Sequence, residues 1–363
     1  NSKDDRSIGS NYIRCLYEGK NYLWVGTDNG LFRYDNQKES FCALSPAITK
    51  PILDIEADKN NNLWFIAGGT LYFKQQVTLS SLNLKSYDDF YAILLSKDSN
   101  QNIWAASGEN VYQYSEESKN FKPITLGFGS IADDLPVIIT ALKGISKSHM
   151  IIGTRHHGAF VYDIKMGTTK KLINNYNEQL YVRDIVEKEN GTIWLATESG
   201  LLIYDTKSKT YSNFKKSYND PYSLTDNALY TMTIDKEGGT WIGSYFGGVN
   251  YLPKEFTPFK KYFPKEGENS ISGNAVREIH QDKNGDYWIG TGDAGLNKLD
   301  ANTGKFQTFT PKNSNIAHYN IHGILPLDNE LWVGTFEHGL DVFDINSNQI
   351  IRHYEQEEGN PYS

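Results

Sequence analysis

The stretch Ile193-Trp194-Leu195-Ala196-Thr197 decides the fold, because the chain contains eight copies of its pattern. The copies start at residues 23, 63, 103, 150, 193, 240, 287 and 331, so they lie 40 to 47 residues apart. All seven Trp residues of the chain occupy the second position of a copy, and Ile151 stands there in the copy without Trp. Self-similarity at such a period indicates a repeat architecture.

Each repeat has the same internal order, which residues 181–214 illustrate. A β-rich run at 181–186 and a polar turn at 189–192 precede the Trp segment, and a Gly-led run at 200–205 and a polar turn at 206–209 lead to a last run at 210–214. Gly, Asn and Asp between short apolar runs are hairpin signals, and no helical period is present. Four short antiparallel strands per repeat are typical of a propeller blade. We therefore expect an all-β β-propeller of four-stranded blades, with the Trp column in the core between them.

The eight repeats are expected to form a single domain over residues 1–363. An eight-bladed ring is slightly preferred over seven blades plus one blade of a second propeller, since a lone blade would expose an apolar face and a sheet edge. The repeats span approximately residues 11–45, 51–80, 90–125, 136–173, 180–216, 228–262, 275–310 and 319–355.

Composition argues against several classes of partner. The net charge of −8 disfavours a nucleic-acid binder, which normally carries a basic stripe, and adhesion to an anionic membrane surface. No apolar run is long enough to cross a bilayer, so this segment is not expected to insert into a membrane. Cys15 and Cys42 fall in the first and fourth strands of one repeat, too far apart for a disulfide, and are expected to be small buried hydrophobes.

Three segments carry a family resemblance. Residues 191–205, 285–299 and 21–35 each resemble the two-component regulator propeller repeat, and residues 219–227 are similar to the linker of that family. The resemblance covers essentially the whole chain. It implies the periplasmic sensor region of hybrid two-component regulators of Bacteroidetes-type bacteria, membrane-anchored in the full-length protein, which recognises oligosaccharides.

The chain also departs from that family pattern. The family has two consecutive seven-bladed propellers, followed by an immunoglobulin-like domain, a membrane span and a kinase, whereas this chain has eight repeats and none of the later parts. Residues 358–363 look like the start of another linker and residues 7–11 like the end of one. We therefore expect a fragment of a longer sensor, with a second propeller or a second copy of the chain as a partner.

The loops between the second and third strands are the expected binding face, because they vary between repeats on a constant frame. Three of these loops carry aromatic or imidazole groups that a simple turn does not need. Sugars stack on such rings, so the candidate carbohydrate-binding residues are Arg155, His156, His157, Tyr245, Phe246, Phe336 and His338.

A column of arginines adds a second candidate feature. Arg183 and Arg277 lie eleven residues before their Trp and Arg14 lies ten before its Trp, so all three open a first strand close to the same face. Guanidinium groups recognise carboxylate or sulfate bidentately, which would suit an acidic or sulfated glycan. The alternative is a salt bridge to the next acid along each strand, such as Asp184 or Glu278.

These features favour a non-catalytic domain that senses an oligosaccharide and thereby controls glycan-utilisation genes. A protein-protein interaction scaffold is the alternative, since fold does not fix function. A sialidase-like glycosidase is the second alternative, because residues 233–241 resemble an Asp-box. This resemblance belongs mostly to one repeat, and no break in the repeat pattern marks a catalytic carboxylate pair or a Tyr nucleophile. The run Asp282-x-Asn284-Gly285-Asp286 resembles part of a calcium loop but continues into a strand. No metal, cofactor or catalytic residue is expected.

Overall fold

The protein is described by a computed structural model, which covers residues 7–19, 22–36, 38–75, 84–128, 135–146, 148–173, 179–255, 259–357 and 359–360. Within these residues the chain is all β, with 31 strands and no helix. Hydrogen bonding joins the strands into seven four-stranded sheets and one three-stranded sheet, in which consecutive strands are antiparallel neighbours. The expected fold of eight antiparallel repeat sheets is confirmed.

Two compact units divide the chain. Unit 1 consists of Asn1–Ser217 and Tyr222–Glu255, and unit 2 of Tyr218–Pro221 and Phe256–Ser363. The first six sheets belong to unit 1 and the last two to unit 2. The single domain over residues 1–363 and the number of blades in a closed ring stay predictions.

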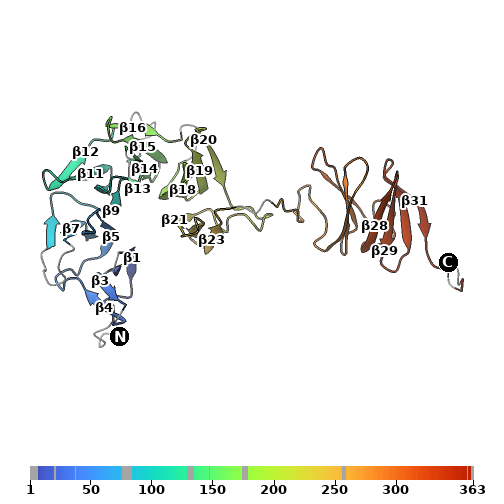
Figure 1. Ribbon diagram of the computed structural model, residues 1–363, viewed down its shortest axis with the longest axis horizontal. Coiled ribbons are helices and arrows are strands. Elements are labelled where there is room, and N and C mark those ends of the chain that lie inside the picture. The colour runs from blue at the N-terminus through green and yellow to red at the C-terminus, as the bar shows by residue number, and fades with distance from the viewer. Residues whose placement is uncertain are drawn as a thin grey trace. The chain divides into compact units, whose positions relative to one another are not determined.

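In unit 1 the sheets follow one another in chain order around an arc, with first strands such as β5, β9 and β13 toward its inside (Figure 1). The strands are β1 (Ile13–Glu18), β2 (Leu23–Thr27), β3 (Gly30–Asp35) and β4 (Ser40–Ala43); β5 (Ile52–Ala57), β6 (Leu63–Ala67), β7 (Thr70–Lys74) and β8 (Leu84–Tyr87); β9 (Leu94–Lys97), β10 (Ile103–Ser107), β11 (Asn110–Ser115) and β12 (Asn120–Ile124); β13 (Ile139–Ser146), β14 (His149–Thr154), β15 (Ala159–Asp163) and β16 (Thr168–Lys171); β17 (Val182–Glu187), β18 (Thr192–Thr197), β19 (Gly200–Asp205) and β20 (Thr210–Phe214); β21 (Leu229–Ile234), β22 (Thr240–Ser244) and β23 (Val249–Leu252).

Unit 2 contains two four-stranded sheets whose first strands, β24 and β28, contact each other. The strands are β24 (Val276–Gln281), β25 (Tyr287–Thr291), β26 (Leu296–Leu299) and β27 (Phe306–Phe309); β28 (Ile321–Leu327), β29 (Glu330–Thr335), β30 (Leu340–Asp344) and β31 (Gln349–Tyr354).

The strands differ from the predicted repeat spans at two places, and the spans themselves stay predictions. The fourth strand of the second repeat, β8 at Leu84–Tyr87, lies beyond the predicted span 51–80. The repeat placed at 228–262 shows three strands in the described residues. Its expected fourth strand falls after Leu252, where residues 256–258 lie outside the described part of the chain.

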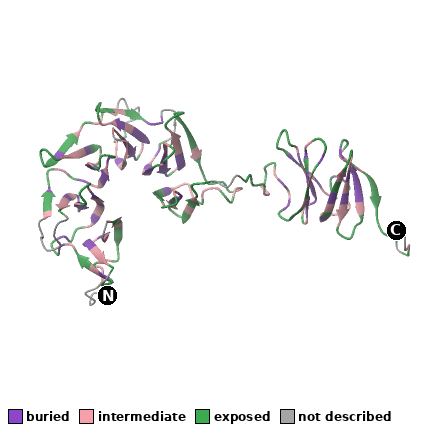
Figure 2. Ribbon diagram, viewed as in Figure 1, coloured by how far each residue is buried: buried purple, intermediate pink, exposed green. Residues whose placement is uncertain are grey.

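The core lies between successive sheets of each unit, where the buried residues concentrate in the strands (Figure 2). Trp64 is 1% exposed and packs with Leu95, Ile103 and Phe121 of the following sheet. The expected role of the Trp column in the core is confirmed for the buried Trp64, Trp104, Trp194 and Trp288. Trp24 and Trp332 are half-buried. Trp241, in the last sheet of unit 1, is 45% exposed, so for Trp241 the expectation of a buried side chain is not met.

Four of the Trp side chains are anchored by an Asp six residues earlier. The indole N–H donates to this carboxylate at 2.8–3.2 Å in each of the pairs Trp64–Asp58, Trp104–Asp98, Trp241–Asp235 and Trp288–Asp282. The Asp–indole contact of an Asp-box therefore recurs in four repeats, whereas the full run with Gly and Thr-Trp is found in residues 233–241. Its carboxylate organises a hairpin, because an acceptor that binds an indole N–H and turn amides holds the two strands in register.

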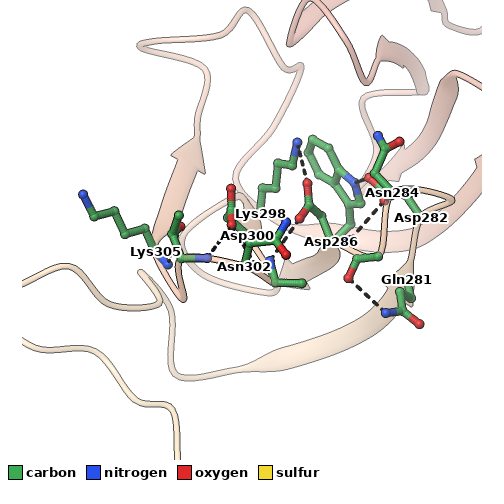
Figure 3. A network of polar contacts seen from close by, with 12 residues as sticks. Gln281, Asp282, Asn284, Asp286, Lys298, Asp300, Asn302 and Lys305 are labelled. Atoms are coloured by element: carbon green, nitrogen blue, oxygen red, sulfur yellow. Dashed lines mark hydrogen bonds and ion pairs between the residues drawn. The ribbon is translucent and has the colours of Figure 1, made fainter.

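The hairpin at Asp282 shows the arrangement in detail (Figure 3). Asp282 accepts from the backbone N–H groups of Asn284 at 2.9 Å and Asp286 at 3.1 Å. Asp286 pairs with Lys298 at 3.1 Å. The carboxylates of Asp282 and Asp286, which resembled part of a calcium loop, are thus engaged by protein donors.

Candidate ligand-binding site

A β-bulge opens the first strand of seven repeats. In β17, Val182 pairs with Thr197 and Asp184 pairs with Ala196, so Arg183 between them has no partner across the ladder. A bulge redirects the side chain of the extra residue and is common beside functional sites. The same register shift leaves one residue unpaired in β1, β5, β13, β21, β24 and β28, namely Arg14, Leu53, Thr140, Tyr230, Arg277 and His322. The predicted arginine column is therefore a column of bulge residues.

The same backbone hydrogen bond recurs in the seven repeats with a bulge and places one loop residue opposite each bulge. The backbone N–H of Glu198, in the loop after β18, donates to the carbonyl of Tyr181, two residues before Arg183, at 3.2 Å. The equivalent bonds, each from the residue four positions after the Trp column, are Asp28 to Tyr12, Gly68 to Pro51, Arg155 to Ile138, Tyr245 to Ala228, Gly292 to Ala275 and Phe336 to Asn320. We call the bulge residue and this loop residue of one repeat a bulge–loop pair.

The side chains of these pairs contact each other in four repeats. Arg14 forms an ion pair with Asp28, and Arg183 with Glu198. Two further pairs are stacked rings, Tyr230 on Tyr245 with centroids 5.2 Å apart and His322 on Phe336, also 5.2 Å apart. The bulge–loop pair is thus a variable two-residue position on a constant backbone frame.

The alternative of a salt bridge is met by Arg14 and Arg183, but with loop acids and not with the acids named in the strands. Asp184 does not pair with Arg183; it accepts from the backbone N–H of Met232 at 2.7 Å. Burial raises the pKa of Asp184, and the hydrogen bond from Met232 opposes that rise. Glu278 lies 3.2 Å from His280 instead of bonding Arg277.

Arg183 is the centre of a larger arrangement in unit 1. Its guanidinium carbon lies 3.9 Å from the ring centre of Tyr181 and 4.4 Å from that of Tyr230, the bulge residue of the next sheet. Burial lowers the pKa of Arg183, but the hydrogen bond to Glu198 and the neighbouring charges outweigh it and the net shift is upward. The guanidinium therefore lies between two aromatic rings, and its charge is neutralised by Glu198.

The stack continues on both sides of Arg183. Arg155 lies 5.5 Å from the Tyr181 ring on one side. On the other side Tyr230 stacks on Tyr245 at an angle of 10°, and the ring of Tyr245 lies 4.2 Å from that of Phe246. We call these six residues, Arg155, Tyr181, Arg183, Tyr230, Tyr245 and Phe246, the ladder; they come from three successive sheets. Its far end is open, since Phe246 is 86% exposed.

The structure brings together four of the residues predicted for the site, Arg155, Arg183, Tyr245 and Phe246. Sequence reasoning missed Tyr181 and Tyr230. The signal for Tyr230 was present, because it lies eleven residues before Trp241 in the column of the arginines. Tyr181 has no such signal, since its role depends on the carbonyl and ring geometry around Arg183.

Two predicted histidines of unit 1 occupy less open positions. His157 is buried, with its Nε2 3.2 Å from the carbonyl oxygen of Leu135, and its backbone N–H donates to Thr154. These contacts take His157 off the exposed face and give it a packing role. His156 is half-buried, with its ring 6.3 Å from that of His157.

The other predicted residues, Arg277, Phe336 and His338, belong to unit 2. His338 donates from Nδ1 to the carbonyl of Phe336 at 2.8 Å, and its ring stacks on His318 with centroids 4.5 Å apart. His318 and His322 were not predicted. The described residues contain no group of three His, Cys, Asp or Glu side chains that could hold a metal ion.

Cys15 and Cys42 lie in β1 and β4, as expected, and both are free thiols. Cys15 is half-buried, whereas Cys42 is exposed, so the expectation of two buried thiols is wrong for Cys42. Burial, followed by the nearby charge of Asp54, raises the pKa of Cys15 to about 12. Among the described residues, no helix is long and apolar enough to cross a membrane.

Comparisons with known proteins agree with the repeat pattern. The family described as two component regulator propeller matches residues 7–29 and 270–293. A histidine kinase P4 from Formosa agariphila is 28% identical over 169 residues, which cover 43% of this chain and 11% of the kinase. The chain thus spans about a tenth of the length of this relative.

Solved structures show further similarity. An extracellular domain assigned to a hybrid two-component system of B. thetaiotaomicron aligns with 97% of this chain and 53% of its own, at 18% identity and a TM-score of 0.46. A chain of the mitotic checkpoint complex aligns over 68% of this chain and 76% of its own, at 11% identity and a TM-score of 0.50, which is a likeness of fold alone.

Proposed function

We propose that this chain is the ligand-sensing part of a hybrid two-component regulator, and that it binds an oligosaccharide on the ladder of unit 1. The observation that carries the proposal is the stack of rings and guanidinium groups across three sheets, which ends in the exposed rings of Tyr245 and Phe246. The matches to the two component regulator propeller family and to part of a histidine kinase support the regulatory context.

The chemistry of the ladder suits a sugar. Aromatic rings offer flat apolar faces for the C–H faces of pyranose rings, while ligand sites fix orientation with a few polar groups at the rim. Arg155 and Glu198 supply such groups beside the rings. Because Glu198 neutralises Arg183, the ladder favours the hydroxyl-bearing face of a sugar over an anionic group.

The proposal places the domain in the periplasm, on a regulator anchored in the membrane by parts of the protein outside this chain. The domain itself is non-catalytic, and it controls glycan-utilisation genes through the rest of the regulator. A ligand shifts a conformational equilibrium only by its difference in affinity for the two states. Signalling therefore requires that the saccharide contact residues whose arrangement changes, and a second propeller or a second copy of the chain is the partner we propose for that change.

A thermal-shift screen with defined oligosaccharides tests the proposal, because a ligand that binds the native state raises Tm. The affinity of any saccharide that raises Tm is then measured by calorimetry with Tyr245→Ala and Phe246→Ala. We expect each variant to weaken binding by about tenfold, as the loss of a buried stacking face predicts. Phe214→Ala is the matched control, since Phe214 is 53% exposed on the outer strand β20.

Other outcomes would contradict the proposal. Hydrolysis of a fluorogenic glycoside by the purified chain would favour the sialidase-like alternative. No Tm shift with any saccharide, together with capture of a defined protein partner, would favour the scaffold alternative. Saccharide binding that Tyr245→Ala and Phe246→Ala leave unchanged would place the site elsewhere.

A further inference from the structure

Arg277 differs from the other two bulge arginines in its surroundings. Arg14 and Arg183 are neutralised by Asp28 and Glu198, the loop residues of their pairs. At the loop position opposite Arg277 the chain has Gly292. Arg277 is exposed, and among the described residues it has no ion pair.

The backbone does not require glycine at position 292. Gly292 is absent from the residues with positive φ, so an L side chain is compatible with its conformation. A Cβ built there would lie 2.9 Å from Nε of Arg277, which is closer than real Cβ atoms approach, so a side chain at position 292 would require the flexible Arg277 side chain to shift; Cβ of Ala275 would lie 3.6 Å away. The missing side chain is therefore the one that would contact the guanidinium, and its absence leaves the charge of Arg277 uncompensated by its pair.

The nearest carboxylates along the chain are held by other donors. Asp293 accepts from the backbone N–H of Asn274 at 3.1 Å, and Glu278 lies 3.2 Å from Nε2 of His280. Neither acid takes the place that Glu198 takes beside Arg183.

The adjoining bulge residue adds a second polar group. β24 and β28 contact each other, and His322 is the bulge residue of β28. In unit 1 the corresponding bulge residues of two adjoining first strands, Arg183 and Tyr230, lie 4.4 Å apart. His322 is exposed and stacked on Phe336. From the construction of unit 1 we infer that His322 is the polar group nearest to Arg277 on the adjoining strand.

We propose that Arg277, left open by Gly292 and accompanied by His322, is a binding site of unit 2, separate from the ladder, for an oxyanion, either a sulfate ester or a carboxylate of a saccharide. Guanidinium groups bind both anions through parallel charge-assisted hydrogen bonds. The saccharide part of this statement rests on the proposed function, whereas anion binding by Arg277 does not. Arg14 and Arg183, which the sequence also suggested for an acidic glycan, are excluded from this role by their acidic partners.

The test follows the arginine Nε–H resonances by NMR during titration with sodium sulfate and, separately, sodium acetate, at ionic strength held constant with chloride. The chain has seven Arg residues, so each signal can be assigned by one substitution. We expect the Arg277 signal to move along a saturating curve with at least one of the two anions. Sulfate and acetate report the sulfate ester and the carboxylate, respectively.

Matched variants make the test specific. Gly292→Glu recreates the arrangement of Arg183 and Glu198 and should weaken anion binding at Arg277 by about tenfold or more. Gly292→Gln, with the same shape and no charge, should retain the response. Glu198→Gly should conversely make the Arg183 signal respond.

The proposal is overturned if the Arg277 signal does not move, or moves only linearly and in parallel with Arg14 and Arg183. It is also overturned if Gly292→Glu responds as the unmodified chain does. Because the probes are simple anions, these outcomes are independent of the saccharide screen, and a failure of the ladder proposal would be distinguishable from a failure of this one.

Discussion

The guanidinium carbon of Arg183 lies 4.4 Å from the ring centre of Tyr230, and this contact connects the bulges of two successive sheets. The contact couples the side chains that we propose for ligand binding to the packing of β17 against β21. Its energy is measurable without any ligand.

Arg183→Met should lower the free energy of unfolding by about 1–2 kcal/mol, because it removes two partly desolvated cation–π contacts. A double-mutant cycle with Tyr230→Leu separates the contact from the loss of each side chain, and we expect a coupling energy of about 0.5–1 kcal/mol. Urea denaturation provides both numbers. Strictly additive effects would show that the two side chains do not interact in solution.

Asp54 should make stability depend on pH. Burial raises the pKa of Asp54 to about 7, although the carboxylate accepts from the backbone N–H of Leu95 at 2.7 Å. Because the folded-state pKa lies above the unfolded value, the contribution of Asp54 is fully present below about pH 4 and is lost as the pH rises through about 7. Asp54→Asn should therefore gain stability relative to the unmodified chain between pH 5 and pH 8, on the order of 2 kcal/mol.

The control for that pH profile is Asp163→Asn. Backbone hydrogen bonding from Met166 lowers the pKa of the half-buried Asp163, so its contribution is present above the unfolded pKa and lost toward low pH. The two variants should differ in the sign of their pH dependence in thermal melts from pH 3 to pH 8. A difference between Asp54→Asn and the unmodified chain that stays constant over this range would count against the raised pKa.

Asp282 should contribute more to stability than its counterpart Asp235. Both accept an indole N–H, from Trp288 at 2.8 Å and from Trp241 at 3.0 Å, but Asp282 and Trp288 are buried while Trp241 is 45% exposed. Asp282→Ala leaves buried donors unsatisfied and should cost about 2–3 kcal/mol, and Asp235→Ala about 1 kcal/mol or less. Equal losses in chemical denaturation would contradict the role we give to burial.

The two thiols should react at different rates. Cys42 is exposed, whereas Cys15 is half-buried with a pKa raised to about 12, so that little of it is thiolate at pH 8. A thiol reagent such as dithionitrobenzoate should therefore modify one group quickly and the second slowly in the folded chain. In Cys42→Ser the fast phase should disappear; a fast phase that survives this substitution would show that Cys15 is accessible.

Much of the candidate site could be predicted from the sequence. The spacing to the Trp column placed Arg14, Arg183 and Arg277 at one position of the first strand, and the variable loops indicated Arg155, Tyr245, Phe246 and Phe336. The pairing of Arg183 with Glu198 rather than Asp184 could not be predicted in this way. It depends on the bulge, which changes the direction of one side chain without altering the period of the repeat.

The amino-acid sequence alone establishes the eight repeats, the order of the strands and the Trp column. A sheet buries a face only if apolar residues recur at the strand spacing, and this recurrence between similar turns is visible in the sequence. Which side chains meet is decided by the tertiary structure. The ladder joins Tyr181 and Arg183 to Tyr230 of the next sheet, and Gly292 leaves Arg277 open, through the bulges and the packing of neighbouring sheets. Contacts between residues far apart in sequence follow from that packing and leave no periodic signature in the repeat itself.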